Sequence, residues 1–291
     1  MSTPQKWLVG CGIGCGVMIL AVIGLVTGTA VYVRSRFRPL QEASDSQRTI
    51  VAAYGAPDVY VPPPDGRIAP ERMEAFLSAR EALKDAQQHL NAAFEAFDVE
   101  SLSRRERSFR GVLRIFNDVS NILAPIGEFV KQRNQILTDK GMGLGEYAYI
   151  YTVAYHSWLG HRPNEGPLLL ERIPFQGGEQ TSDDNPGFTP ESVQRHYQRL
   201  VIRLLENELG GIQAGGQIQW RNALKEEIAR LERDPDRVAW QNQLPVQIDG
   251  CLKPYRGRLT STYHPATNYI ELLTLTEFNQ YRFTGPVEAQ R

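Results

Sequence analysis

The stretch GMGLGEYAYIYTVAYHSWLG, residues 141–160, is the strongest indication of how this chain folds. Its one formal charge is at Glu146, and five aromatic residues follow along it: Tyr147, Tyr149, Tyr151, Tyr155 and Trp158. With 3.6 residues per turn, these side chains lie on every face of a helix. A helix that is apolar all round is typically buried at the centre of a helical protein. We therefore expect a central helix from about Leu144 to Leu159.

Two amphipathic patterns precede this central helix. Pro70 opens the first, and apolar residues then recur at helical spacing to about Asp98. The second begins at the capping box SRRE of residues 103–106 and repeats apolar residues every three and four positions as far as Val130. Pro125 lies inside this pattern and is expected to kink the helix. The heptad spacing predicts packing against an antiparallel neighbour.

Further helical patterns follow a long loop, which we expect over residues 161–188 because periodicity is weak there. Helices are predicted over three later ranges: about 189–209, 220–233 and 245–263. Residues 268–276, NYIELLTLT, fit a strand or a short helix, because nine residues are too few for periodicity to decide. The body is therefore expected to be an all-α antiparallel bundle of five to seven helices, with at most one short extended segment near the C-terminus.

The N-terminal segment is predicted to span a membrane. No residue from Trp7 to Val33 is charged, and a helix of that length is about 40 Å long, against a hydrocarbon core of about 30 Å. The run is also longer than the apolar part of a cleaved signal peptide, so we expect a retained anchor. Small residues at spacings of three and four, with Val17 among them, form a seam that predicts self-association of the anchor: Gly10, Gly14, Ala21, Gly24 and Gly28. The alternative is a chance alignment of glycines, which are common in membrane helices.

These patterns divide the chain into an anchor and a body. The expected units are a tail 1–6, a transmembrane helix 7–33, a basic and proline-rich linker 34–68, a first bundle segment 69–160, a long loop 161–188, a second bundle segment 189–283 and a tail 284–291. A single N-terminal anchor favours a bacterial inner-membrane protein whose body lies outside the cytoplasm. The arginines that follow the anchor favour the opposite orientation under the positive-inside rule: Arg34, Arg36 and Arg38.

No motif in the sequence identifies a reaction. The five histidines include no pair four apart, and neither a CxxC pair nor a nucleophile elbow is present. The body has one thiol, Cys251, and the glycine-rich GCGIGCG lies in the membrane segment. We therefore predict no catalytic, cofactor-binding or metal-binding residues, no cofactor and no enzyme. The net charge of −1 argues against nucleic-acid binding.

Two sets of charged residues remain as candidates, each with a structural alternative. Arg107, Arg110 and Arg114 share a helical face that would bind anionic lipid headgroups or another polyanion, or would pair with acids of the preceding helix. Glu146 would act as an acid or base if buried among the tyrosines. Alternatively, it stays exposed in the first turn of its helix, where a carboxylate is favourable.

The sequence therefore favours a non-enzymatic, single-pass membrane module that binds a protein or scaffolds the cell envelope. The expected partners are the lipid bilayer, a second copy through the anchor and an unidentified protein. A first alternative is a bundle that binds a lipid or other apolar ligand in a cavity lined by the aromatic helix. A second is an enzyme whose site combines scattered residues such as Glu146, His156 and Cys251.

Overall fold

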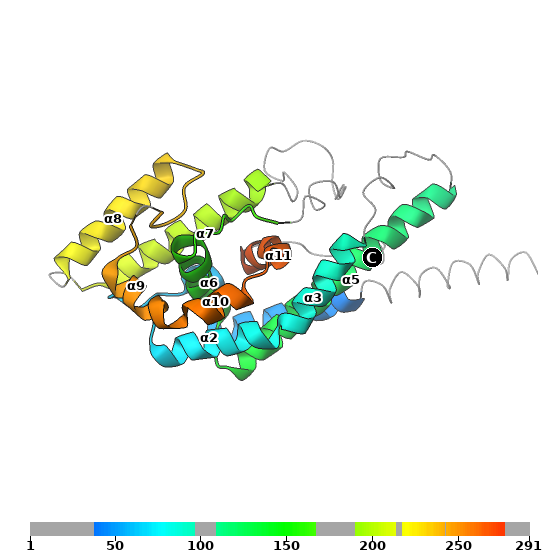
Figure 1. Cartoon of the computed structure of the whole chain (residues 1–291), viewed down its shortest axis with the longest axis horizontal. Helices are drawn as coiled ribbons and strands as arrows, with labels where there is room; N and C mark the ends of the chain where they lie inside the picture. Colours follow the sequence, from blue (N-terminus) through cyan, green and yellow to red (C-terminus); the bar gives the residue numbers. More distant parts are fainter. Residues whose placement is uncertain (1–37, 97–108, 167–189, 214–216, 242, 277–291) are drawn as a thin grey trace, which may run out of the picture.

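The computed structural model describes residues 38–96, 109–166, 190–213, 217–241 and 243–276 (Figure 1). Over these ranges every regular element is a helix and none is a strand, which confirms the predicted all-α class. The predicted span 7–33, with its seam of Gly10, Gly14, Ala21, Gly24 and Gly28, lies outside the described residues. No helix within the described ranges is long and apolar enough to cross a membrane.

Residues 38–54 form a helix inside the segment expected to be a linker. Leu40, Ala43 and Ile50 of this helix are buried at helical spacing, and the side-chain amide of Gln47 donates to the carbonyl of Thr274 at 3.0 Å. The segment that follows contains the 3-10 turn Pro57–Val59 and is also packed, with Ile68 buried. Residues 38–68 therefore belong to the packed body and do not form a free spacer, because their apolar positions find partners there.

Helices α2 (Pro70–Ala82), α3 (Lys84–Glu95) and α5 (Phe109–Asp139) form one side of the body (Figure 1). The single helix expected over about 70–98 is divided at Leu83 into α2 and α3. α3 packs along α5, which buries Leu90 and Phe94. α5 continues through Pro125, and its side chains before residue 121 are outside the described ranges.

The aromatic stretch forms the centre of the body, as predicted. α6 (Leu144–Tyr151) continues into a π-helical turn, Thr152–Trp158, and every residue from Tyr147 to His156 is buried. α6 contacts α2, α5 and α11, and Figure 1 shows it enclosed by its neighbours. Gly145 lets the segment around the 3-10 turn Pro57–Val59 lie directly on α6, because a Cβ there would be 2.3 Å from the Cβ of Tyr60.

The remaining helices are α7 (Pro190–Gly211), α8 (Ile218–Arg233), α9 (Val246–Leu252), α10 (Arg256–Thr262) and α11 (Pro265–Thr276). The single helix expected over about 245–263 is divided by the 3-10 turn Lys253–Tyr255, because Pro254 has no amide hydrogen and clashes with the preceding turn. α11 settles the ambiguity over residues 268–276 in favour of a helix, which packs on α3, α6 and α7.

A fully buried ionic cluster joins α2, α5 and α11 through Arg80, Arg133 and Glu271. One carboxylate oxygen of Glu271 accepts hydrogen bonds from Arg80 Nη1 and from the Tyr147 hydroxyl. The other accepts one from Arg133 Nη1 at 3.1 Å. Arg80 Nη2 also donates to the carbonyl of Thr262 at 2.9 Å. Buried ion pairs require such additional hydrogen bonds to offset the loss of hydration. The cluster therefore fixes how these helices meet.

Candidate binding groove

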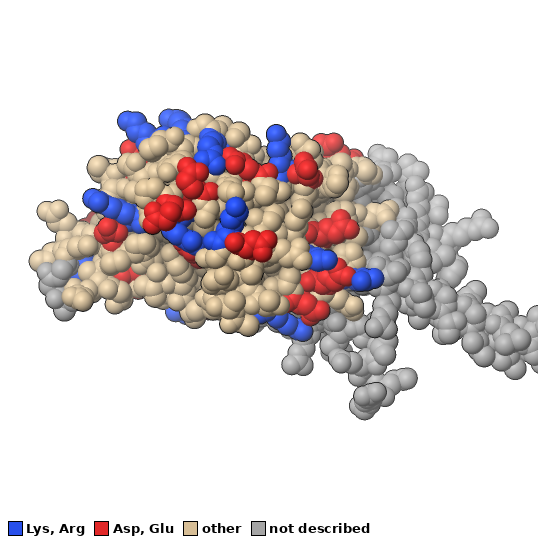
Figure 2. All heavy atoms as spheres, turned by 90° about the horizontal axis from the view of Figure 1, so that it is seen from below, with Lys and Arg blue, Asp and Glu red and all other residues tan. Residues whose placement is uncertain are grey.

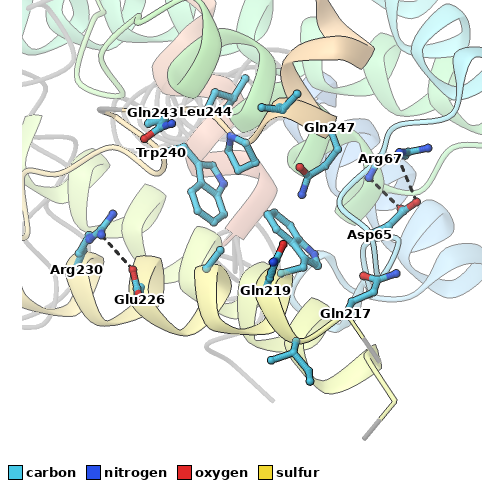
Figure 3. Close-up of a pocket in the computed structure, with 15 residues that line it drawn as sticks. Asp65, Arg67, Gln217, Gln219, Glu226, Arg230, Trp240, Gln243, Leu244 and Gln247 are labelled. Carbon is cyan, nitrogen blue, oxygen red and sulfur yellow. Dashed lines mark hydrogen bonds and ion pairs between the residues drawn. The ribbon is translucent and has the colours of Figure 1, made fainter. Parts of the chain in front are cut away.

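An open cavity of about 1030 Å³ lies between α8 and the segment that leads into α9 (Figure 3). Trp220 lines it from α8, Trp240 lines it from the connecting segment, and Asp65 and Arg67 close a third side from the turn before α2. In Figure 3, Trp240 and Gln247 project towards α8 across the opening. We call this cavity the α8 groove; it is open to solvent and slightly larger than the clefts of about 300–1,000 Å³ that bind small ligands.

The two tryptophans of the α8 groove are stacked on each other. Their ring centroids lie 5.5 Å apart with an interplanar angle of 21°. Trp220 is 7% exposed and Trp240 is 6% exposed, so both rings are almost wholly covered by protein. They form a rigid base for the groove, and little of either ring is free for a ligand to stack on.

Backbone strain within the described residues is concentrated at this groove. Two non-glycine residues there have a left-handed backbone, Gln217 with φ of 46° and Trp240 with φ of 56°, and both line the groove. A bulky residue with positive φ is an outlier that costs free energy. Such strain persists only where surrounding contacts enforce it, and it is enriched at functional sites.

Glu227 of α8 helps to hold the left-handed backbone of Trp240 in place. Its carboxylate is buried and accepts the backbone N–H of Trp240 at 2.8 Å. It also accepts Arg237 Nε at 3.1 Å and Nη2 at 3.3 Å, so its charge is compensated. The backbone N–H of Ala239 donates to the hydroxyl of Tyr197 at 3.1 Å. Glu227 is therefore a positioning residue for the wall of the groove.

The rim of the groove combines neutral amides with apolar side chains. Four glutamines contribute to it, and none of their side-chain amides has a hydrogen-bond partner among the described residues: Gln217, Gln219, Gln243 and Gln247. Ile218 and Val246 are 65% and 82% exposed. These side chains leave unused donors, acceptors and apolar surface at the opening.

The charges at the groove pair with one another. Asp65 lies 3.7 Å from Arg67, and Glu226 lies 3.3 Å from Arg230 (Figure 3). Over the wider surface, basic and acidic side chains are interspersed on the face shown in Figure 2, without a large patch of one sign. The groove therefore offers a ligand no excess of either charge.

Among the charged candidates, only Glu146 has a described side chain, and it does not line the groove. Arg107 lies outside the described residues, and only the backbones of Arg110 and Arg114 are described, in α5, so anion contact stays a prediction. Glu146 follows neither alternative, since it forms a bidentate ion pair with Arg72 of α2 and is partly buried. Its carboxylate joins α6 to α2 and faces Arg72 instead of a cluster of tyrosines.

Glu146, His156 and Cys251 do not form one site. His156 follows Glu146 by ten residues along the same continuous helical segment, which separates them by about 15 Å. His156 is buried on the π-helical turn, where its Nδ1–H donates to the carbonyl of His161 at 3.0 Å. Burial lowers the pKa of His156 to about 4, so the ring is neutral. Cys251 is a free, half-buried thiol on α9.

Sequence reasoning missed the α8 groove. Trp220 fits the apolar stripe of its helix, and Trp240 lies in a segment without periodicity. No signal within either segment shows that the two rings stack, because this contact depends on how the chain returns to α8. No protein-family model, curated protein or solved structure matches this chain. The fold and the groove alone therefore define the class of this protein, which is a helical body with an open groove that carries no excess charge.

Proposed function

We propose that this chain is a non-enzymatic, membrane-anchored helical module that binds a polypeptide segment in the α8 groove. One observation carries the proposal: the two non-glycine residues with a left-handed backbone in the described ranges both line this cavity. Strain of this kind is kept where it holds a functional surface in shape.

The chemistry of the groove favours a polypeptide as the occupant. An extended peptide presents alternating N–H donors and carbonyl acceptors, and a glutamine amide offers both complementary groups. The exposed side chains of Ile218 and Val246 would contact apolar residues of the segment. Because Asp65 pairs with Arg67 and Glu226 with Arg230, an uncharged segment fits better than a charged one.

The predicted anchor completes the proposal. A transmembrane helix over residues 7–33 would hold the body next to a bilayer, in a bacterial inner membrane, with the groove facing the extracytoplasmic space. The small-residue seam of that helix would bring two copies together and present two grooves side by side. Protease accessibility in spheroplasts tests the orientation, and a body protected from added protease would contradict it.

The lipid-binding alternative has less support from the body. It depends on the aromatic helix lining a cavity, whereas the hydroxyl of Tyr151 donates to Asn268 at 3.0 Å and that of Tyr155 bonds Thr262 at 2.9 Å. The rings of Tyr151 and Tyr155 also pack edge to face, with centroids 4.8 Å apart. These tyrosines therefore act as core residues, and native mass spectrometry of the protein tests for a retained lipid.

Photo-crosslinking in intact membranes tests the proposed function. A photoreactive residue at Gln219 or Val246 is expected to cross-link to a polypeptide segment, identified as a fused peptide by mass spectrometry. The matched control places the same residue at Glu232, which is exposed on α8 but does not line the groove. Adding Val246→Glu to the Gln219 reporter should abolish its cross-link. Equal labelling from Glu232, or no polypeptide adduct from either groove position, would contradict the proposal.

A further inference from the structure

Glu208 of α7 is a fully buried carboxyl group behind the wall of the α8 groove. Its Oε1 accepts a hydrogen bond from the indole Nε1–H of Trp220 at 2.9 Å. Its Oε2 is also buried and has no hydrogen-bond partner among the residues that the structure describes. A buried polar atom without a partner is uncommon and costs free energy, above all when it carries charge.

The groups around Glu208 do not neutralise a negative charge. The segment between the 3-10 turn Pro57–Val59 and α2 contributes Asp65 and Tyr60, and α6 contributes Tyr149. No Lys, Arg or His of the described residues forms an ion pair or hydrogen bond with Glu208. Ionised Glu208 would therefore stand in an aromatic pocket beside another carboxylate, with a single donor, Trp220.

Trp220 connects this carboxyl to the groove. Its ring lines the cavity and stacks on Trp240, while the backbone of Gly66 lies so close that a Cβ there would be 2.6 Å from the ring. The ring is thus held between Gly66, Trp240 and Glu208. If the carboxyl of Glu208 ionises, water can solvate it only after the Trp220 ring moves.

We propose that Glu208 is a proton-operated latch on Trp220, which keeps the α8 groove formed while the carboxyl is protonated and loosens it when the carboxyl ionises. On ionisation the proton leaves to solvent, and the carboxylate then requires hydration at Oε2. Water reaches Oε2 by displacing the covering wall, which includes Trp220. The coupling of Glu208 to Trp220 does not depend on the proposed function; only its effect on peptide binding rests on that proposal.

The charge balance sets the working range of this latch. Burial, partly opposed by the hydrogen bond from Trp220 and reinforced by Asp65, raises the pKa of Glu208 to about 8. One pH unit above that midpoint the ionised form exceeds the protonated form about tenfold. The groove is therefore formed at neutral pH and loosens in mildly alkaline conditions.

Indole NMR of the full chain in detergent tests the latch without any ligand. The four tryptophans give four ¹⁵N-indole resonances, and Trp220→Phe identifies that of Trp220. This resonance is expected to titrate with a midpoint near pH 8 in the native chain and to stay constant from pH 6 to 10 in Glu208→Gln, which mimics the protonated form. Glu226→Gln, at the exposed rim, is the matched control and should titrate like the native chain.

Hydrogen exchange gives the second readout. After correction for intrinsic rates, segments 217–224 and 239–241 should exchange several-fold faster at pH 9 than at pH 7 in the native chain, and equally at both in Glu208→Gln. In Trp220→Phe the loss of the indole donor should move the exchange midpoint to higher pH. A Trp220 resonance that does not titrate, or loosening that persists in Glu208→Gln, would overturn the latch. Neither the NMR nor the exchange measurement uses a peptide, so the latch is tested separately from the peptide binding that cross-linking tests.

Discussion

At the scale of the residue, two buried carboxyl groups, Glu227 and Glu208, hold the tryptophans that line the groove. Glu227 is matched with Arg237 and with the N–H of Trp240, whereas Glu208 has one indole donor. The first fixes a strained backbone, and the second leaves the neighbouring wall sensitive to protonation. Similar side chains on adjacent helices thus have opposite consequences, because their hydrogen-bond partners differ.

Replacing Glu227 by Gln should destabilise the body by about 2–4 kcal/mol, since it leaves the mostly covered guanidinium of Arg237 without its counter-ion. Urea unfolding of the full chain in detergent measures this change. Glu226→Gln removes a solvent-exposed pair one position away and should change stability by less than about 1 kcal/mol. Equal effects of the two substitutions would contradict the positioning role of Glu227.

His156 should make the body less stable in acid. Burial lowers its folded-state pKa to about 4, below the unfolded value of 6.5, so the unfolded chain binds the extra proton between these values. The stabilising contribution is complete above pH 6.5 and is lost as the pH falls towards 4, by about 1.4 kcal/mol per pH unit at most. Unfolding midpoints measured from pH 7 to pH 4 should fall less steeply in His156→Gln than in the native chain.

At the scale of the element, close backbone contact determines which segments belong to the body. A Cβ on Gly127 of α5 would lie 2.6 Å from the carbonyl carbon of Pro39 and 2.8 Å from the amide nitrogen of Leu40. The helix over residues 38–54 therefore packs directly on α5, which explains why it does not behave as a spacer. Small residues permit this approach where a larger side chain would separate the two backbones.

Gly127→Ala should destabilise the body by about 1–3 kcal/mol, because the backbone at Pro39 cannot move aside as a flexible side chain would. The control is Gly250→Ala on α9, where nothing lies within 4 Å of the added methyl group and the higher helix propensity of alanine should be neutral or stabilising. Thermal unfolding of the two variants compares them. A neutral Gly127→Ala would show that residues 38–54 are not packed on α5.

At the scale of the whole molecule, one buried carboxylate connects segments far apart in the chain. Glu271 of α11 binds Arg80 and Arg133, which precede it by 191 and 138 residues. Its geometry requires α2, α5 and α11 to be in place together. Burying these charges costs free energy of hydration, and removing one partner of such a cluster is strongly destabilising.

Glu271→Gln should destabilise the whole body by about 3–5 kcal/mol, because Arg80 and Arg133 remain buried without their shared anion. Glu81→Gln breaks exposed contacts with Arg258 and serves as the control, with an expected loss below about 1 kcal/mol. Hydrogen exchange should report faster opening in α2, α5 and α11 together in Glu271→Gln. Loss of protection in α11 alone would show that the cluster does not couple these helices.

Local sequence patterns were enough to predict the all-α class and the central place of residues 144–158, because helical periodicity and an apolar surface on every face are local properties. The α8 groove, the Glu271 cluster, the pairing of Glu146 with Arg72 and the burial of Glu208 arose only from tertiary packing. Each of these joins residues that are apart in sequence, and a local pattern carries no record of which distant side chain will face it. Gln217 and Trp240 do not stand out in the sequence. Their left-handed backbones, which distinguish the groove, are set only by the tertiary contacts around them.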